Sequence, residues 1–142
     1  MGKLADRLSD VPVLSEANVP TTLSAAAAGQ PMVVDLFATW CESCRDQVPA
    51  LSELAAAQAG KLMVVGVDIG EKRHEVEQQL RGFGATYPIY FDPDFHFADS
   101  LGISQLPAML VVDRAGVIRH RSRTLDKAAR QAIDTLLAAP GE

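Results

Sequence analysis

The chain has 142 residues, 48% of them hydrophobic, and a formal net charge of −5. This size fits one globular domain with a single core, and the negative charge argues against a nucleic-acid-binding surface. The sequence has no run of about 18 apolar residues and therefore predicts no transmembrane helix. Residues 1–10 carry charges throughout and lack the apolar core of a signal peptide. We therefore expect a flexible lead-in there and a single domain over residues 11–142.

The first regular segments are expected directly after this lead-in. Residues 11–14 predict a short edge strand, since proline is tolerated at a sheet edge. Ser15 or Asn18 is then expected to cap an alanine-rich helix that runs to Ala28 and is ended by Gly29.

Two buried strands with a helix between them are predicted next. Residues 32–36 and 61–67 are largely apolar, and residues 46–58 place apolar side chains at helical spacing. The strands of such a unit run parallel, with a right-handed crossover. The remaining chain predicts a polar helix, a short strand, a short helix, a β-hairpin and a closing amphipathic helix, over residues 71–83, 87–91, 95–101, 108–121 and 125–138.

The only two cysteines, Cys41 and Cys44, lie where the first buried strand turns into the helix. Free N–H groups and the helix dipole favour a negative charge at that position, and a thiolate is the nucleophile of disulfide exchange. The three-residue spacing puts both sulfurs on one helical face, within bonding reach. Cys41 is the expected nucleophile and Cys44 the expected resolving thiol.

Two other interpretations of the cysteines are a pair of core residues and half of a zinc site. Zinc needs about four ligands, and the chain has no second cysteine pair. Its three histidines, at positions 74, 96 and 120, are scattered. A redox pair is the interpretation that the residues favour.

The stretch from Phe37 to Arg45, which contains Trp40-Cys41-Glu42-Ser43-Cys44, resembles the active site of thioredoxin-like thiol–disulfide oxidoreductases. Pro49 matches the proline that kinks the active-site helix of that family, and Leu106-Pro107 matches its cis-proline strand. The resemblance covers about residues 11–139. It implies an α/β thioredoxin fold, with a central mixed β-sheet flanked by helices.

Within this superfamily, the segment between the two halves is most similar to the TlpA/ResA branch, which includes the cytochrome c maturation reductases. The similar phrases are residues 66–71, 87–92 and 101–107, and they imply a TlpA-like strand and helix inserted between the halves. Many chains of that branch begin with a longer β-hairpin, which this sequence does not indicate.

Two acidic residues are candidates for proton transfer and thiol tuning. Asp35 lies in an apolar strand, where burial raises a carboxyl pKa, and it matches the buried acid of thioredoxin that shuttles a proton for the second cysteine. The partner lysine of that acid is replaced near Gly66. Glu71 matches a glutamate of ResA-like proteins that tunes thiol acidity and contacts partners. The alternatives are an acid that reaches solvent at a strand end for Asp35 and a helix-capping carboxylate for Glu71.

The resemblance implies a partner-binding rim made of Trp40, Leu106 and Pro107, although Trp40 is also compatible with core packing. Alternation along a strand places Arg119, Arg121 and Arg123 on one face. A charged edge that blocks aggregation is the favoured interpretation, and a docking patch for acidic partners is the alternative.

Together these observations predict a protein-disulfide reductase, because Glu42 opposes a thiolate on Cys41, although Arg45 acts in the other direction. We expect a monomer without cofactor, metal or membrane contact, which exchanges disulfides with substrate proteins and an upstream electron donor. In the TlpA/ResA branch such substrates include apocytochrome c and copper-site assembly proteins.

The expected location is periplasmic or otherwise extracytoplasmic, through a signal or anchor absent from this chain. The alternatives are a general cytosolic thioredoxin and a non-catalytic metal- or partner-binding module on the same fold. The Pro-x-x-x-Thr-x-x-Cys pattern of a peroxidase is absent from the sequence.

Overall fold

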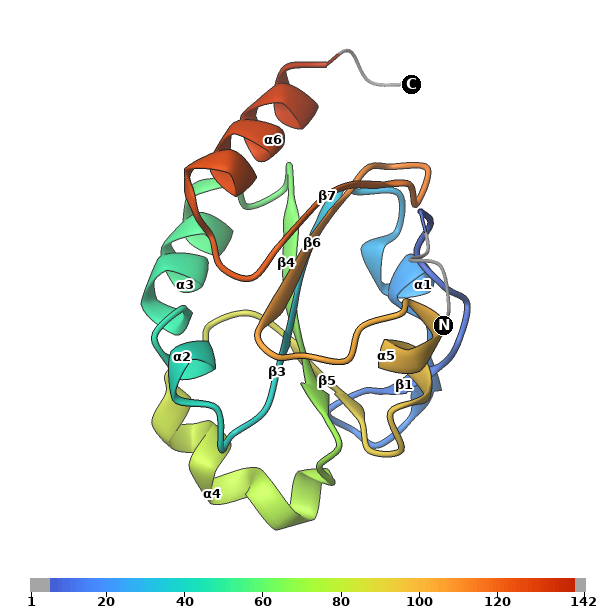
Figure 1. Ribbon diagram of the computed structural model, residues 1–142, viewed down its shortest axis with the longest axis vertical. Helices are drawn as coiled ribbons and strands as arrows, with labels where there is room; N and C mark the ends of the chain where they lie inside the picture. The colour runs from blue at the N-terminus through green and yellow to red at the C-terminus, as the bar shows by residue number, and fades with distance from the viewer. Residues whose placement is uncertain (1–5, 140–142) are drawn as a thin grey trace.

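The computed structural model describes residues 6–139, which form a seven-stranded mixed sheet with helices on both faces (Figure 1). The strand order is β2-β1-β5-β4-β3-β6-β7. The strands are β1 (Val13–Leu14), β2 (Pro20–Thr21), β3 (Met32–Phe37), β4 (Met63–Ile69), β5 (Ile89–Asp92), β6 (Ala108–Val112) and β7 (Ile118–Ser122). The helices are α1 (Leu23–Ala27), α2 (Glu42–Arg45), α3 (Val48–Ala57), α4 (Arg73–Phe83), α5 (His96–Ser100) and α6 (Lys127–Ala138).

The strand that leads to the cysteines lies at the centre of the sheet. β3 pairs with β4 in parallel and with β6 in antiparallel orientation, and all six of its residues are buried. The predicted parallel pair is therefore confirmed. β5 pairs in parallel with β4 on the far side from β3, so the expected inserted strand is an integral strand of the sheet.

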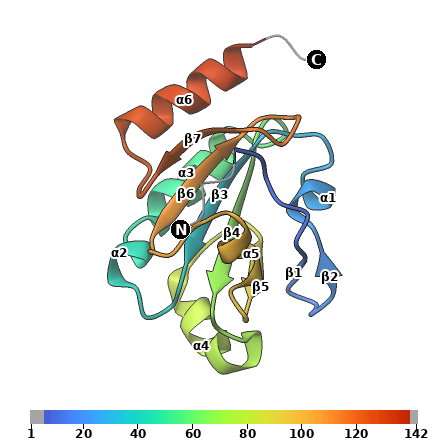
Figure 2. The ribbon, with the colours of Figure 1, turned by 45° about the vertical axis from the view of Figure 1, so that its right-hand side comes forward.

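Each face of the sheet has its own hydrophobic core. One core joins the sheet to α3, α4 and α6 and includes both cysteines, and the other joins the sheet to α1 and α5. Figure 2 shows α1 and the β1–β2 hairpin on the opposite side of the molecule from α2, α3 and α6. The cysteine motif thus lies at the end of the central strand, against the larger core.

The active-site region contains two consecutive helices, and Pro49 lies at the start of the second. α2 ends at Arg45 and α3 begins at Val48, with the proline in its first turn. A proline is tolerated there because its missing N–H has no partner within the first turn of a helix. The Gln47 side chain, between the two helices, accepts a hydrogen bond of 2.9 Å from the Leu125 N–H, which anchors this break to the segment before α6.

The predicted start of the N-terminal helix is wrong, because α1 begins at Leu23. Ser15 lies in a turn, where its Oγ accepts from the Val19 N–H, and Asn18 has a left-handed backbone. Pro20 then excludes a continuous helix because it lacks an N–H and restricts the residue before it. Thr22 is the actual cap of α1, with its Oγ1 accepting from Ala25.

The expected edge position of residues 11–14 is also wrong. β1 lies between β2 and β5 and pairs with both, so β2 occupies the edge. Within the expected lead-in, Leu8 donates a 2.7 Å hydrogen bond to Gly116, and Arg7 forms a bridge with Val117. Residues 1–5 lie outside the described part of the chain, and the boundary at residue 11 stays a prediction.

Candidate active site

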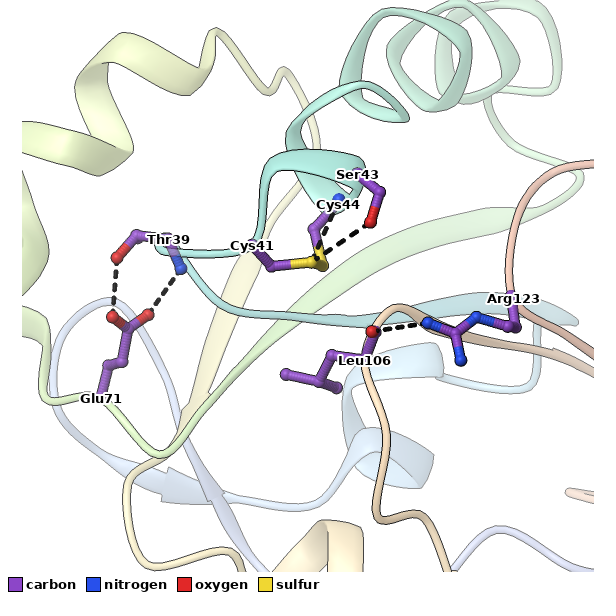
Figure 3. The surroundings of a disulfide bond; sticks show 7 residues. All are labelled: Thr39, Cys41, Ser43, Cys44, Glu71, Leu106 and Arg123. Carbon is purple, nitrogen blue, oxygen red and sulfur yellow. Dashed lines mark hydrogen bonds between the residues drawn. A yellow bond between two sulfur atoms is a disulfide. The ribbon is translucent and has the colours of Figure 1, made fainter.

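Cys41 and Cys44 form a disulfide at the start of α2 (Figure 3). Cys41 is the N-cap of α2, and its Sγ accepts a 3.3 Å hydrogen bond from the Cys44 N–H. The Ser43 hydroxyl lies 3.7 Å from the same sulfur. Donors at these positions favour negative charge on Cys41 when the disulfide is open.

The two sulfurs differ in their access to solvent. Cys41 is 6% exposed, whereas Cys44 is fully buried. Cys41 is therefore the more accessible cysteine of the pair, and Cys44 lies behind it. This arrangement suits sequential attack by two thiols on one partner disulfide.

Asp35 lies in the middle of β3, the strand that leads to the cysteines, and is 1% exposed. It shares a strand face with Val33 and Phe37, which belong to the same core as Cys41 and Cys44. Its Oδ1 has no hydrogen-bond partner among the described residues, and burial raises the pKa of Asp35 to about 7. The carboxyl group can thus hold or release a proton near neutral pH.

The position opposite Asp35 cannot carry a side chain without rearrangement. Gly66 is its neighbour on β4, and a Cβ there would lie 2.9 Å from Ile89 Cδ1 and 3.0 Å from Phe37 Cε1. Apolar side chains thus fill the space beside Asp35. Burial, together with the charge of Asp35, raises the pKa of Tyr87, which places this phenol in the same surroundings.

Glu71 holds the loop before the cysteines, and within residues 6–139 its carboxylate hydrogen-bonds Thr39 and neither cysteine. Its Oε1 accepts a 2.8 Å hydrogen bond from the Thr39 N–H, and its Oε2 accepts a 2.7 Å bond from the Thr39 hydroxyl (Figure 3). The N-cap hydrogen bond of α4 comes from another acid, because Glu75 Oε1 accepts from the Lys72 N–H over 3.4 Å. Glu71 therefore fixes the backbone two residues before Cys41.

Asp68 is a second buried acid that the sequence analysis overlooked. It is fully buried on β4, opposite Phe37. Burial first, and then the hydrogen bond and charge of Glu71, raise the pKa of Asp68 to about 9. Burial also acts to raise the pKa of Glu71, but hydrogen bonds from Asp68 and Thr39 outweigh it and lower that pKa. The interaction between the two acids thus raises the pKa of Asp68 and lowers that of Glu71, so the proton of the pair resides on Asp68 near neutral pH.

Gly70 makes the turn that brings Glu71 to this position. Its φ is +76°, in the left-handed region that favours glycine, and a Cβ there would overlap the ring of Phe95. The left-handed backbone and the nearby Phe95 ring thus both favour glycine at position 70, immediately before Glu71.

The rim around Cys41 has two sides, one at Trp40 and one at the cis-proline. Trp40 is 72% exposed, so it does not pack in the core. It lines a hollow of about 530 Å³ with Glu42, Arg45, Asp46, Gly82 and Phe83, in which Arg45 lies over the Phe83 ring at 5.6 Å. The other side is formed by Leu106 and Pro107, which are joined by a cis peptide bond.

The three arginines near β7 have different surroundings. Arg119 forms a 2.7 Å ion pair with Asp113, and Arg121 is half-buried. Arg123 donates hydrogen bonds to the Gln105 side chain and to the carbonyl oxygen of Leu106. The sequence analysis treated the three as one set, because strand alternation says nothing about the partner of each side chain.

Most of the overlooked contacts join distant positions. The partners of Thr39 and Arg123 could not be predicted from the sequence, since they lie 32 and 17 residues away. Asp68 could have been found, because it interrupts an apolar strand in the same way as Asp35.

Residues 6–139 contain no group of three or more His, Cys, Asp or Glu side chains placed to hold a metal ion. Within the same range, none of the helices is long and apolar enough to span a bilayer.

Residues 5–121 match the model of the AhpC/TSA family, and the chain belongs to this family. Among curated proteins, it is 32% identical over 114 residues to the thioredoxin-like protein YneN of Bacillus subtilis, covering 76% of this chain and 66% of that protein. It is 33% identical over 94 residues to the thiol:disulfide interchange protein DsbE of Yersinia pestis, covering 66% of this chain and 48% of that protein. The chain thus spans about half to two thirds of these relatives.

The fold prediction is confirmed by solved structures. A DsbE-type thiol:disulfide interchange protein from Chlorobium tepidum superimposes with a TM-score of 0.84, over 97% of this chain and 100% of that chain. The sequence identity of 22% makes this a likeness of fold alone. The thioredoxin-like fold and the resemblance to this group of proteins, both expected from the sequence, are therefore shown.

Proposed function

We propose that this protein is a thiol–disulfide oxidoreductase that reduces disulfides of partner proteins through Cys41 and Cys44. The observation that carries the proposal is the asymmetry of the pair. Cys41 caps α2, accepts a hydrogen bond from the Cys44 N–H and reaches solvent, whereas Cys44 is buried behind it. The name of the DsbE relative, a thiol:disulfide interchange protein, supports the same activity.

The reaction transfers two electrons in two exchange steps. The Cys41 thiolate attacks one sulfur of the partner disulfide, and the other partner sulfur leaves as a thiolate that takes up a proton. Cys44 then loses its proton and attacks Cys41 Sγ, which forms the Cys41–Cys44 disulfide and releases the second partner thiol. The partner disulfide is reduced to two thiols, and an upstream dithiol donor must reduce this protein again.

Asp35 is the proposed acceptor for the Cys44 proton. It shares a face of β3 with Val33 and Phe37, which pack in the core that contains both cysteines, and its pKa of about 7 allows both protonation states near neutral pH. Glu71 is proposed as a positioning residue, because it holds Thr39 and so fixes the approach to Cys41. Trp40, Leu106 and Pro107 are proposed to contact the partner.

The direction of electron flow and the location are parts of the same proposal. Similarity to the TlpA/ResA branch supports an extracytoplasmic reductant that acts on proteins such as apocytochrome c or copper-site assembly proteins. Fractionation of cells that carry the full gene tests the location. Recovery of the protein in the cytoplasm would favour the general thioredoxin alternative.

The decisive experiment combines a trapping assay with a redox titration. Cys44→Ser should accumulate a mixed disulfide with partner proteins, whereas Cys41→Ser should trap none and lose disulfide-reducing activity. In dithiothreitol or glutathione buffers, a reductase should have a potential near about −270 mV. A potential near about −120 mV would reverse the proposed direction, and a pair that never forms a disulfide would leave only a binding module.

A further inference from the structure

Arg123 is fixed at the rim of the site by two hydrogen bonds. Its Nη1 donates to Gln105 Oε1 over 3.1 Å, and its Nη2 donates to the Leu106 carbonyl oxygen over 2.8 Å. Leu106 packs against the core that contains both cysteines. Figure 3 shows Leu106 and Arg123 on the opposite side of the disulfide from Thr39 and Glu71. An exposed guanidinium is therefore held beside the route to Cys41.

The positive charge of Arg123 is not neutralised by the contacts that hold it. Both acceptors are uncharged, and among residues 6–139 no carboxylate forms an ion pair with this side chain. Arg119 differs, because its Nε lies 2.7 Å from Asp113 Oδ2. A guanidinium has five N–H donors, so the two bonds leave three for another molecule. Arg123 can thus bind a carboxylate without leaving Leu106.

The backbone beneath Arg123 is also open to an extended segment. Leu106 lies outside β6, and its N–H makes no hydrogen bond within the described part of the chain. Its carbonyl oxygen accepts from Arg123 and keeps a second lone pair. A partner segment along residues 104–106 can pair with this backbone and present its side chains to the guanidinium.

We propose that Arg123 is a specificity-determining residue, which selects partner disulfides flanked by a Glu or Asp on the segment that lies along residues 104–106. The proposal rests on the thiol–disulfide exchange proposed above. Arginine suits this role because its planar fork binds a carboxylate through two parallel hydrogen bonds. Since the site is exposed, the preference should be modest, about two- to five-fold in rate.

The test uses the reduced protein and disulfide-linked peptides that differ at one residue beside the reactive cysteine. That residue is Glu, Gln or Lys, and it is placed in turn before and after the cysteine. The wild type should react fastest with Glu and slowest with Lys on one flank only, because a fixed guanidinium contacts one side of the segment. Arg123→Ala should bring the Glu-to-Lys rate ratio on that flank close to one, and high salt should lower it in the wild type.

Arg119→Ala is the matched control, since it removes an exposed arginine whose charge is already paired. It should keep the wild-type ratio. The proposal is overturned if the ratio survives in Arg123→Ala, falls equally in Arg119→Ala, or is the same on both flanks, because a general field then explains the preference. Reaction of the wild-type protein with the Gln peptide shows that thiol–disulfide exchange occurs without a charged residue beside the reactive cysteine. Failure of the wild type with all peptides would instead overturn the exchange activity, and this proposal with it.

Discussion

Replacing Asp35 with asparagine should make the stability of the protein less sensitive to a rise in pH from about 4 to about 7. Burial raises the pKa of Asp35 from 3.8 to about 7, so the folded protein holds this proton more tightly than the unfolded chain does. The stability gained from the protonated form is therefore present at low pH and lost as the pH rises from about 4 to about 7. Asparagine keeps the shape of the side chain and cannot ionise, so it avoids this loss.

The expected size of the effect follows from that pKa difference. Each tenfold change in proton affinity corresponds to about 1.4 kcal/mol. Between 3.8 and about 7, ionisation of Asp35 therefore costs the fold about 4 kcal/mol at pH 8 and about 2 kcal/mol at pH 5. Asp35→Asn should thus gain about 2–3 kcal/mol relative to the wild type between these two pH values.

Urea denaturation of the oxidised proteins at pH 5 and pH 8 measures this difference. Far-UV circular dichroism is the suitable probe, because Trp40 is 72% exposed and reports poorly on core packing. The cysteines do not titrate in the oxidised protein, and Asp68 contributes equally to both proteins. Asp134→Asn, which removes an exposed charge, controls for the change in net charge. An equal stability difference at both pH values would refute the burial argument.

Three further predictions concern Asp68 on β4, the bond between Thr39 and Glu71, and the turn at Gly70. Asp68→Asn should gain stability relative to the wild type as the pH rises from 5 to 9, since the pKa of Asp68 is raised to about 9, mainly by burial; an unchanged difference in urea midpoints would count against this. Thr39→Val should cost about 1–2 kcal/mol in the same assay by removing the 2.7 Å bond to Glu71, whereas Thr39→Ser should keep the bond and most of the stability. Gly70→Ala should lower the thermal midpoint and slow insulin reduction, because left-handed backbone and overlap with Phe95 displace Glu71; wild-type values of both would contradict this role of the turn.

The sequence predicted the core of the site because its signals are local. Trp40-Cys41-Glu42-Ser43-Cys44 lies between an apolar strand and a helical repeat, and those neighbours alone place Cys41 at a helix start. Asp35 was found for the same reason, since an acid in an apolar strand is visible without any long-range contact. The prediction of the N-terminal helix was wrong because two local signals competed. Alanine content favoured a long helix, and Pro20 prevented it.

The tertiary structure decided what each polar group at the site touches. Sheet register puts Asp68 opposite Phe37 and brings the following Glu71 to Thr39. The return of the chain after β7 carries Arg123 to Leu106. These pairs are far apart in the sequence, and hydrophobic periodicity reports which face a residue lies on but not which side chain it meets. The strands and the cysteine pair could therefore be predicted from local residue order. The contacts of Glu71 with Thr39 and of Arg123 with Leu106 exist only because the folded sheet brings distant segments together.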